Sequence, residues 1–150
     1  MRRAKRSALV PYTPAQMFRL VDEAEHYPDF LPWCSQSTVH YRDATSVEAT
    51  LEMRRAGLRK SFRTRNTQSF GEFIQIELAE GPFRLLQGNW TFTAIGDSGC
   101  RVELEMRFEF ESVMLDRMLG HFFEDTLNSL VDAFTRRAAV VYGPPGSRDK

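Results

Sequence analysis

The sequence contains few of the residues that mark a disulfide-stabilised or metal-binding protein. It has two cysteines, Cys34 and Cys100, without C-x-x-C spacing, and three scattered histidines. Cysteines and histidines in this number and spacing match neither a disulfide framework nor the ligand pattern of a zinc site. We therefore expect two reduced thiols, no metal site and no required cofactor.

Long apolar runs are also missing. No stretch approaches the roughly 20 apolar residues of a membrane-spanning helix, and the run after the basic N-terminus ends at Ala8, Leu9 and Val10. Such a run is too short for a signal peptide. The sequence thus predicts a cytoplasmic protein and leaves peripheral contact with the inner membrane open.

Neither sign of charge is in excess. Lys and Arg together number 20, as do Asp and Glu, so attraction for an anionic partner must come from local clusters. The aromatic residues comprise 12 Phe but only 4 Tyr and 2 Trp. Purely apolar rings in such number favour a large core or an apolar ligand.

The hydrophobic period changes along the chain. Residues 3–10 are typical of a strand, Thr13 and Pro14 predict the start of a short helix, and the two prolines within residues 26–34 predict a further short helical turn. Apolar and polar residues then alternate as in half-buried strands. The alternating segments are residues 47–54, 74–78, 86–94 and 101–110, separated by turn signals at 56–57, 81–82 and 96–99.

After Ser112 the period becomes helical again, with an apolar stripe from Leu115 to Val141. About 30 residues at 1.5 Å each make a helix of about 45 Å, long enough to cover a sheet. We predict an α+β fold in which a curved antiparallel sheet wraps around the long C-terminal helix, with two short N-terminal helices. Residues 1–143 are expected to form a single domain and residues 144–150 a flexible tail.

Several motifs resemble one known family. They are Val10 to Phe18, Tyr27-Pro-Asp-Phe-Leu-Pro-Trp-Cys34, Phe62-Arg-Thr-Arg-Asn66, Gly81-Pro-Phe83, Gly88-Asn-Trp-Thr-Phe92 and Phe108-Glu-Phe110. In this order they resemble the coenzyme Q-binding protein family of the START-like (helix-grip, polyketide cyclase-like) superfamily, whose bacterial branch includes ribosome association toxins. The resemblance covers about residues 3 to 142 and implies a helix-grip fold with an apolar cavity.

The resemblance implies two functions. The first, our main hypothesis, is non-enzymatic binding of ubiquinone or a related polyprenyl lipid in support of respiratory electron transport. The alternative is a toxin of a toxin-antitoxin pair that binds the large ribosomal subunit and blocks subunit joining, with an antitoxin as a further partner. A third hypothesis, an aromatic polyketide cyclase, lacks any inward acid/base pair, so no catalytic residues are predicted.

The predicted cavity lies between the sheet and the long helix. Phe30, Leu31 and Trp33 are expected either to form a lid at its mouth or simply to pack against the terminal helix. For each wall residue, a filled core is the competing interpretation. Gly120, in the middle of the helix, indicates a bend or the close approach of a ligand or of the sheet. The predicted wall residues are Met53, Phe62, Leu86, Trp90, Met106, Phe108, Phe122, Phe123, Leu130 and Phe134.

A basic cluster surrounds the turn at residues 56–57. Six cations and no carboxylate occur between residues 54 and 65, which suits a surface for RNA phosphates or anionic lipids. The competing interpretation is a solvated strand face balanced by Glu103, Glu105 and Glu109. The six cations are Arg54, Arg55, Arg59, Lys60, Arg63 and Arg65.

Overall fold

The computed structural model describes residues 1–144, and it contains seven strands, two α-helices and a short 3₁₀ helix. The elements in chain order are β1 (Arg2–Val10), α1 (Pro14–Asp22), η1 (Ala24–Asp29), β2 (Cys34–Arg42), β3 (Ser46–Arg55), β4 (Leu58–Ser69), β5 (Phe73–Glu80), β6 (Phe83–Ile95), β7 (Gly99–Phe110) and α2 (Val113–Tyr142). Of the predicted tail, residues 145–150 lie outside the described residues.

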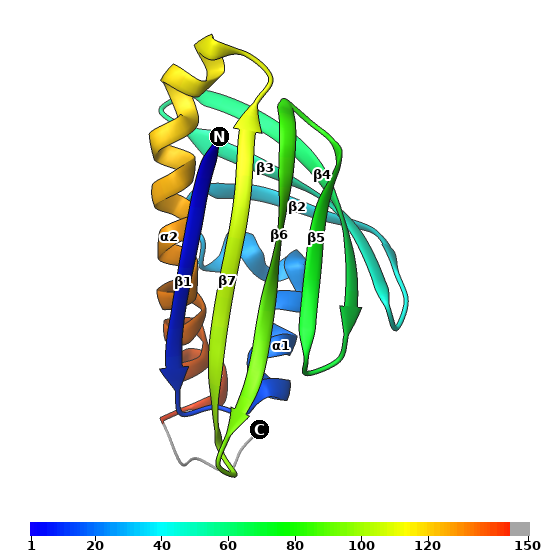
Figure 1. Cartoon of the computed structure of the whole chain (residues 1–150), viewed down its shortest axis with the longest axis vertical. Helices are drawn as coiled ribbons and strands as arrows, with labels where there is room; N and C mark the ends of the chain where they lie inside the picture. The colour runs from blue at the N-terminus through cyan, green and yellow to red at the C-terminus, as the bar shows by residue number, and fades with distance from the viewer. Residues whose placement is uncertain (145–150) are drawn as a thin grey trace.

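The seven strands form one antiparallel sheet in the order β1-β7-β6-β5-β4-β3-β2. From β2 to β7 each strand pairs with the next, whereas β1 pairs with β7. The sheet curls around α2, with β1, β7 and β6 on the near side and β2 to β4 crossing behind (Figure 1). The predicted curved sheet around a long C-terminal helix is confirmed.

Helix α2 begins and ends as the sequence indicates. The Ser112 hydroxyl accepts a 3.1 Å hydrogen bond from the Leu115 amide, and Gly143 ends the helix with a φ of 84°. Its apolar stripe faces the sheet, with Leu119, Phe123 and Phe134 almost fully buried. None of the helices within residues 1–144 is long and apolar enough to span a bilayer.

Arg2 links strand β1 to α2 through hydrogen bonds and salt bridges. Its guanidinium donates to both carboxylate oxygens of Asp116, at 2.8 and 3.0 Å, and to Glu124 at 2.9 Å. It crosses α2 at Gly120, where an added Cβ would lie 2.5 Å from the Arg2 Nε. Gly120 therefore marks the close approach of the sheet, one of the predicted alternatives.

The two N-terminal helices pack at the ends of the sheet strands. Thr13 and Gln16 form a capping box at the start of α1, with Pro14 in its first turn. Helix α1 contacts α2, β6 and β7, and η1 contacts β2. The Tyr27 hydroxyl of η1 donates to the Val21 carbonyl of α1, which ties the two short helices together.

Phenylalanines fill one end of the space between the sheet and α2. The Phe123 ring lies 4.8 Å from that of Phe108 and 5.3 Å from that of Phe83, and Phe83 stacks on Phe110 at 4.6 Å. Phe62 joins them edge-on at 5.9 Å from Phe123. This end is a solid aromatic core.

Candidate functional site

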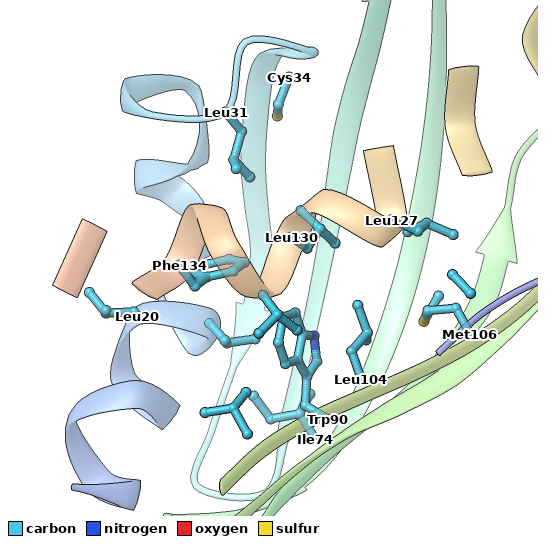
Figure 2. Close-up of a cluster of buried hydrophobic side chains, with 14 of the residues drawn as sticks. Leu20, Leu31, Cys34, Ile74, Trp90, Leu104, Met106, Leu127, Leu130 and Phe134 are labelled. Carbon is cyan, nitrogen blue, oxygen red and sulfur yellow. The ribbon is translucent and has the colours of Figure 1, made fainter. Parts of the chain in front are cut away.

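The remaining space between the sheet and α2 contains a cavity. It lies between the inner faces of strands β3 to β7, the middle of α2 and the segment around η1. Figure 2 shows Leu130 and Phe134 of α2 facing Trp90 and Leu104 of the sheet, and the rings of Trp90 and Phe134 meet edge-to-face at 5.3 Å. The cavity is therefore bounded by both layers of the fold.

Most of the residues predicted for the cavity do lie on its wall. Leu31 and Trp33 line it from the segment after η1, and seven more line it from the sheet and α2. These seven are Phe62, Leu86, Trp90, Met106, Phe123, Leu130 and Phe134.

Four predicted cavity residues lie elsewhere. Phe108 belongs to the solid aromatic core, and Met53 is 1% exposed and packs into the core opposite Cys34 at the end of β3. Phe30 packs edge-on against Phe134 and lies beneath the Arg137 guanidinium. Phe122 is half-buried under Arg55, because its neighbour Phe123 takes the inward position on α2.

Nine further residues line the cavity and were not predicted. Thr64 and Asn66 are the informative ones, since they are polar and sit at successive inward positions of β4. Both residues follow Phe62 at intervals of two, so extending the period of a strand from Phe62 would have predicted that they point inward. The complete group is Ala24, Tyr27, Ala49, Leu51, Thr64, Asn66, Ile76, Leu104 and Leu127.

Two buried polar atoms belong to the cavity wall. The Oδ1 of Asn66 and the Nε1 of Trp33 have no hydrogen-bond partner within the described residues. Leaving such a group unpaired costs about 1–3 kcal/mol, so each is a candidate contact for a ligand.

The cavity is small in this conformation. Its volume is about 80 Å³, whereas small-molecule pockets commonly measure about 300–1,000 Å³. A long polyprenyl chain therefore enters only if the wall moves. The segment formed by η1 and residues 30–33 is the part of the wall that is not held in the sheet or in α2.

Burial raises the pKa of one phenol on the cavity wall and of both cysteine thiols in the core. Desolvation raises the pKa of Tyr27, which keeps its phenol neutral and donating to Val21. Burial likewise raises the pKa of the Cys34 and Cys100 thiols, each to about 11. Neither thiol is a thiolate at neutral pH, so neither suits a nucleophile.

The basic cluster divides into two parts. At the β3–β4 turn, Arg54 and Arg59 face each other across the strands and are exposed, and Arg55 covers Phe122 at 4.8 Å. Within residues 1–144, no carboxylate forms a salt bridge with these three arginines or with Lys60. We call Arg54, Arg55, Arg59 and Lys60 the hairpin-tip cations.

Arg63 and Arg65 share one carboxylate partner. Both donate to Glu48 on the neighbouring β3, at 2.9 and 3.2 Å, and the two arginines lower the pKa of that carboxyl. The competing interpretation, a balance by Glu103, Glu105 and Glu109, does not apply to this pair, because both arginines bind Glu48 and those glutamates lie on β7. Arg63 and Arg65 therefore offer an anionic partner less than the hairpin-tip cations do.

The histidines lie outside the cavity. His26 is exposed beside Asp29, His40 bonds Thr50 on the outer face, and His121 is exposed near Arg2. Among residues 1–144, no group of three His, Cys, Asp or Glu side chains is placed to hold a metal ion. The cavity wall itself carries no Asp, Glu, His, Lys or Arg within the described residues.

Several known proteins are similar to nearly the whole chain. The ribosome association toxin RatA of Vibrio cholerae is 41% identical over 143 residues, which cover 95% of this chain and 99% of the relative. RatA of Escherichia coli K12 is 37% identical, covering 95% and 90%. A mitochondrial coenzyme Q-binding protein, COQ10 of Dictyostelium discoideum, is 24% identical, covering 93% and 70%.

Solved structures share the fold. The 18 kDa protein CC1736 of Caulobacter crescentus is 30% identical with a TM-score of 0.70, covering 96% of this chain and 100% of that one. The Zhui aromatase/cyclase of Streptomyces has a TM-score of 0.80 at 14% identity, covering 91% and 93%. At that identity the likeness to a cyclase concerns the fold alone.

The sequence also matches a family over residues 10–135, described as polyketide cyclase / dehydrase and lipid transport. This stretch runs from the end of β1 into the last third of α2 and includes every cavity residue named above. The resemblance to a START-like family is thereby confirmed: the chain belongs to the polyketide cyclase / dehydrase and lipid transport family.

Proposed function

We propose that this protein associates with the ribosome, at the large subunit, through the hairpin-tip cations. The observation that carries the proposal is the 41% identity, over 95% of this chain and 99% of the relative, to a ribosome association toxin. The alternative hypothesis from the sequence is thus better supported than quinone binding. An antitoxin partner stays a prediction.

Charge at the β3–β4 turn supports RNA as the partner. Like charges directly opposite on neighbouring strands destabilise a hairpin, and Arg54 and Arg59 are such a pair. An anionic partner relieves this repulsion. Cations that contact phosphates also release counterions, which gives binding that weakens steeply with salt.

The test is co-sedimentation of the full chain with purified large ribosomal subunits over a range of salt concentrations. The charge-reversed double variant Arg54→Glu, Arg59→Glu should bind far more weakly than the wild type. The dependence of log affinity on log salt should also flatten, by about 1 for each phosphate that the variant no longer binds.

The matched control is Arg101→Glu, Arg136→Glu. Both residues are exposed cations outside the β3–β4 hairpin, one near the start of β7 and one in the last third of α2. This double variant changes the net charge equally and should bind like the wild type. Equally weakened binding in both variants would contradict the assignment of the tip, and no binding by the wild type would contradict ribosome association itself.

A second candidate function is the binding of a small apolar molecule in the cavity, with ubiquinone or a related polyprenyl lipid as the ligand that the sequence favours. The apolar wall supports it, and so does the 24% identity to a coenzyme Q-binding protein. The volume of about 80 Å³ counts against a long chain in this conformation. Among residues 1–144, no acid/base pair lines the cavity, and we propose binding without chemistry.

This candidate is tested by solvent extraction of protein purified from its own host, with mass spectrometry of the extract. A stoichiometric lipid should be present in the wild type and absent from Leu130→Trp, which fills the cavity from α2. Salt-dependent ribosome binding should survive in Leu130→Trp, because the hairpin-tip cations lie outside the cavity. A wild-type extract without lipid would contradict this second function.

A further inference from the structure

Strand β4 presents polar side chains to an otherwise apolar interior. Its inward positions after Phe62 are Thr64, Asn66 and Gln68, and Thr64 and Gln68 are 8% and 6% exposed. Gln68 lies beyond the cavity and donates to Asp22 at 2.9 Å. Thr64 and Asn66 face the cavity itself.

These positions are costly to fill with polar groups. The neighbouring inward residues across the sheet are apolar, with Val47 and Ile76 opposite Asn66, and Ala49 and Leu78 opposite Thr64. The Asn66 Oδ1 is buried without a partner in the described residues. Since an unpaired buried polar atom destabilises the folded state, leucine at this position should give a more stable protein.

The chemistry of the amide restricts what can pair with it. An asparagine amide presents an oxygen acceptor on one side and a nitrogen donor on the other, and it can be turned by half a rotation. A ligand group that both donates and accepts satisfies the amide in either orientation. A hydroxyl group has this property, whereas an ether or a ketone only accepts.

The wall also excludes charge. Because no ionisable cation or carboxylate lines the cavity within residues 1–144, an ionised ligand would be buried without a counter-ion. A carboxylate or ammonium ligand is therefore disfavoured strongly.

We propose that the cavity selects a neutral apolar molecule that bears a hydroxyl group, an alcohol or a phenol, and that this hydroxyl hydrogen-bonds with Asn66 beside Thr64. The inference rests on the second candidate function and deepens it by naming the chemical class of the ligand.

The test compares four probes of equal chain length: an aliphatic alcohol, its methyl ether, the alkane and the carboxylate. Their affinities for the full chain are measured by calorimetry or by displacement of a fluorescent apolar dye. The alcohol should bind about fivefold to tenfold more tightly than the ether, since one net hydrogen bond contributes about this factor. The carboxylate should bind most weakly.

Two variants separate a ligand contact from a structural role. Asn66→Leu should bind the alcohol no better than the ether and should unfold at the same or a higher urea concentration than the wild type. Thr64→Val, which is nearly isosteric, should reduce the preference for the alcohol in part. The matched control Thr67→Leu changes an exposed residue on the outer face of the same strand and should keep the full preference.

The outcomes are distinct. Equal binding of alcohol and ether by the wild type, or a preference that persists in Asn66→Leu, would overturn the hydroxyl assignment and leave apolar binding intact. Tight binding of the carboxylate would likewise overturn the hydroxyl assignment and leave apolar binding intact. If none of the four probes bound, both the hydroxyl assignment and the second candidate function would fail.

Discussion

Gly120 is important because the Arg2 side chain packs directly against it. Alanine is the better helix former by about 1 kcal/mol, yet a Cβ at this position would meet the Nε of Arg2 at 2.5 Å. We expect Gly120→Ala to destabilise the protein by about 1–2 kcal/mol. In an Arg2→Ala background, the same change should stabilise it.

Urea unfolding of the two single variants and the double variant measures this coupling. If Gly120→Ala stabilised both backgrounds, the close approach of Arg2 would not constrain α2. Nothing in the sequence around Gly120 indicates its partner, because Arg2 lies more than a hundred residues away.

Asp116 makes the stability of this contact depend on pH. Its hydrogen bonds with Arg2 hold the pKa of the carboxyl below its usual range. The contribution is therefore present above the unfolded pKa of about 3.9 and disappears as the pH falls through the lower folded value. Asp116→Asn should lower the free energy of unfolding at about pH 7 and have little effect at about pH 2.

Unfolding curves of both proteins at several pH values check this sign. The effect should be modest, because the Asp116 side chain is 38% exposed and solvent screens the pair. A difference that grows on acidification would contradict the pairing with Arg2.

At the scale of elements, α2 carries two adjacent phenylalanines with different roles. Phe123 is 2% exposed within the aromatic core, while Phe122 is half-buried under Arg55. Phe123→Ala should cost about 3–5 kcal/mol, and Phe122→Ala about 1 kcal/mol or less. Thermal or urea unfolding of the two variants, which remove the same atoms one residue apart, makes the comparison direct.

The sequence predicts some elements better than others for a physical reason. Strands β3, β5, β6 and β7 alternate cleanly and were predicted, as was α2. Strand β2 was not, because bulges near Ser35 and His40 break its alternation. In β4, inward polar residues and outward arginines hide the period of two.

The prediction of the candidate site is limited in the same way. Wall residues such as Trp90 and Leu130 follow from periodicity, which tells the inner face of an element from the outer one. It does not show which part of that face borders a cavity, so Met53 and Phe108 were predicted as wall residues although they do not line the cavity in this structure. The pairing of Arg63 and Arg65 with Glu48 depends on the register of β3 with β4, which the sequence pattern alone does not provide.

At the scale of the whole molecule, the reactivity of the two buried cysteines can show whether the protein unfolds cooperatively. Cys34 lies at the start of β2, on one edge of the sheet, and Cys100 lies in β7, near the other edge. Both thiols are buried, with pKa values raised to about 11 by burial. If residues 1–143 form one cooperative domain, as predicted, alkylation in increasing urea should modify both at the same midpoint.

Mass spectrometry of the alkylated protein reads the two sites separately. Reaction of Cys34 well before Cys100 would indicate that β2 and η1 open independently of the rest. Such local opening would also provide the movement that a larger ligand needs to enter the cavity.

The pairing of β1 with β7 has a consequence for biosynthesis. As the nascent chain emerges from the exit tunnel, β2 to β6 can form hairpins in order, each with a neighbour already made. Strand β1 emerges first but has no partner until residues 99–110 follow, and its anchor on α2 comes later still. Completion of the fold is thus deferred to the last stage of translation, and a truncated product carries an unpaired N-terminal strand.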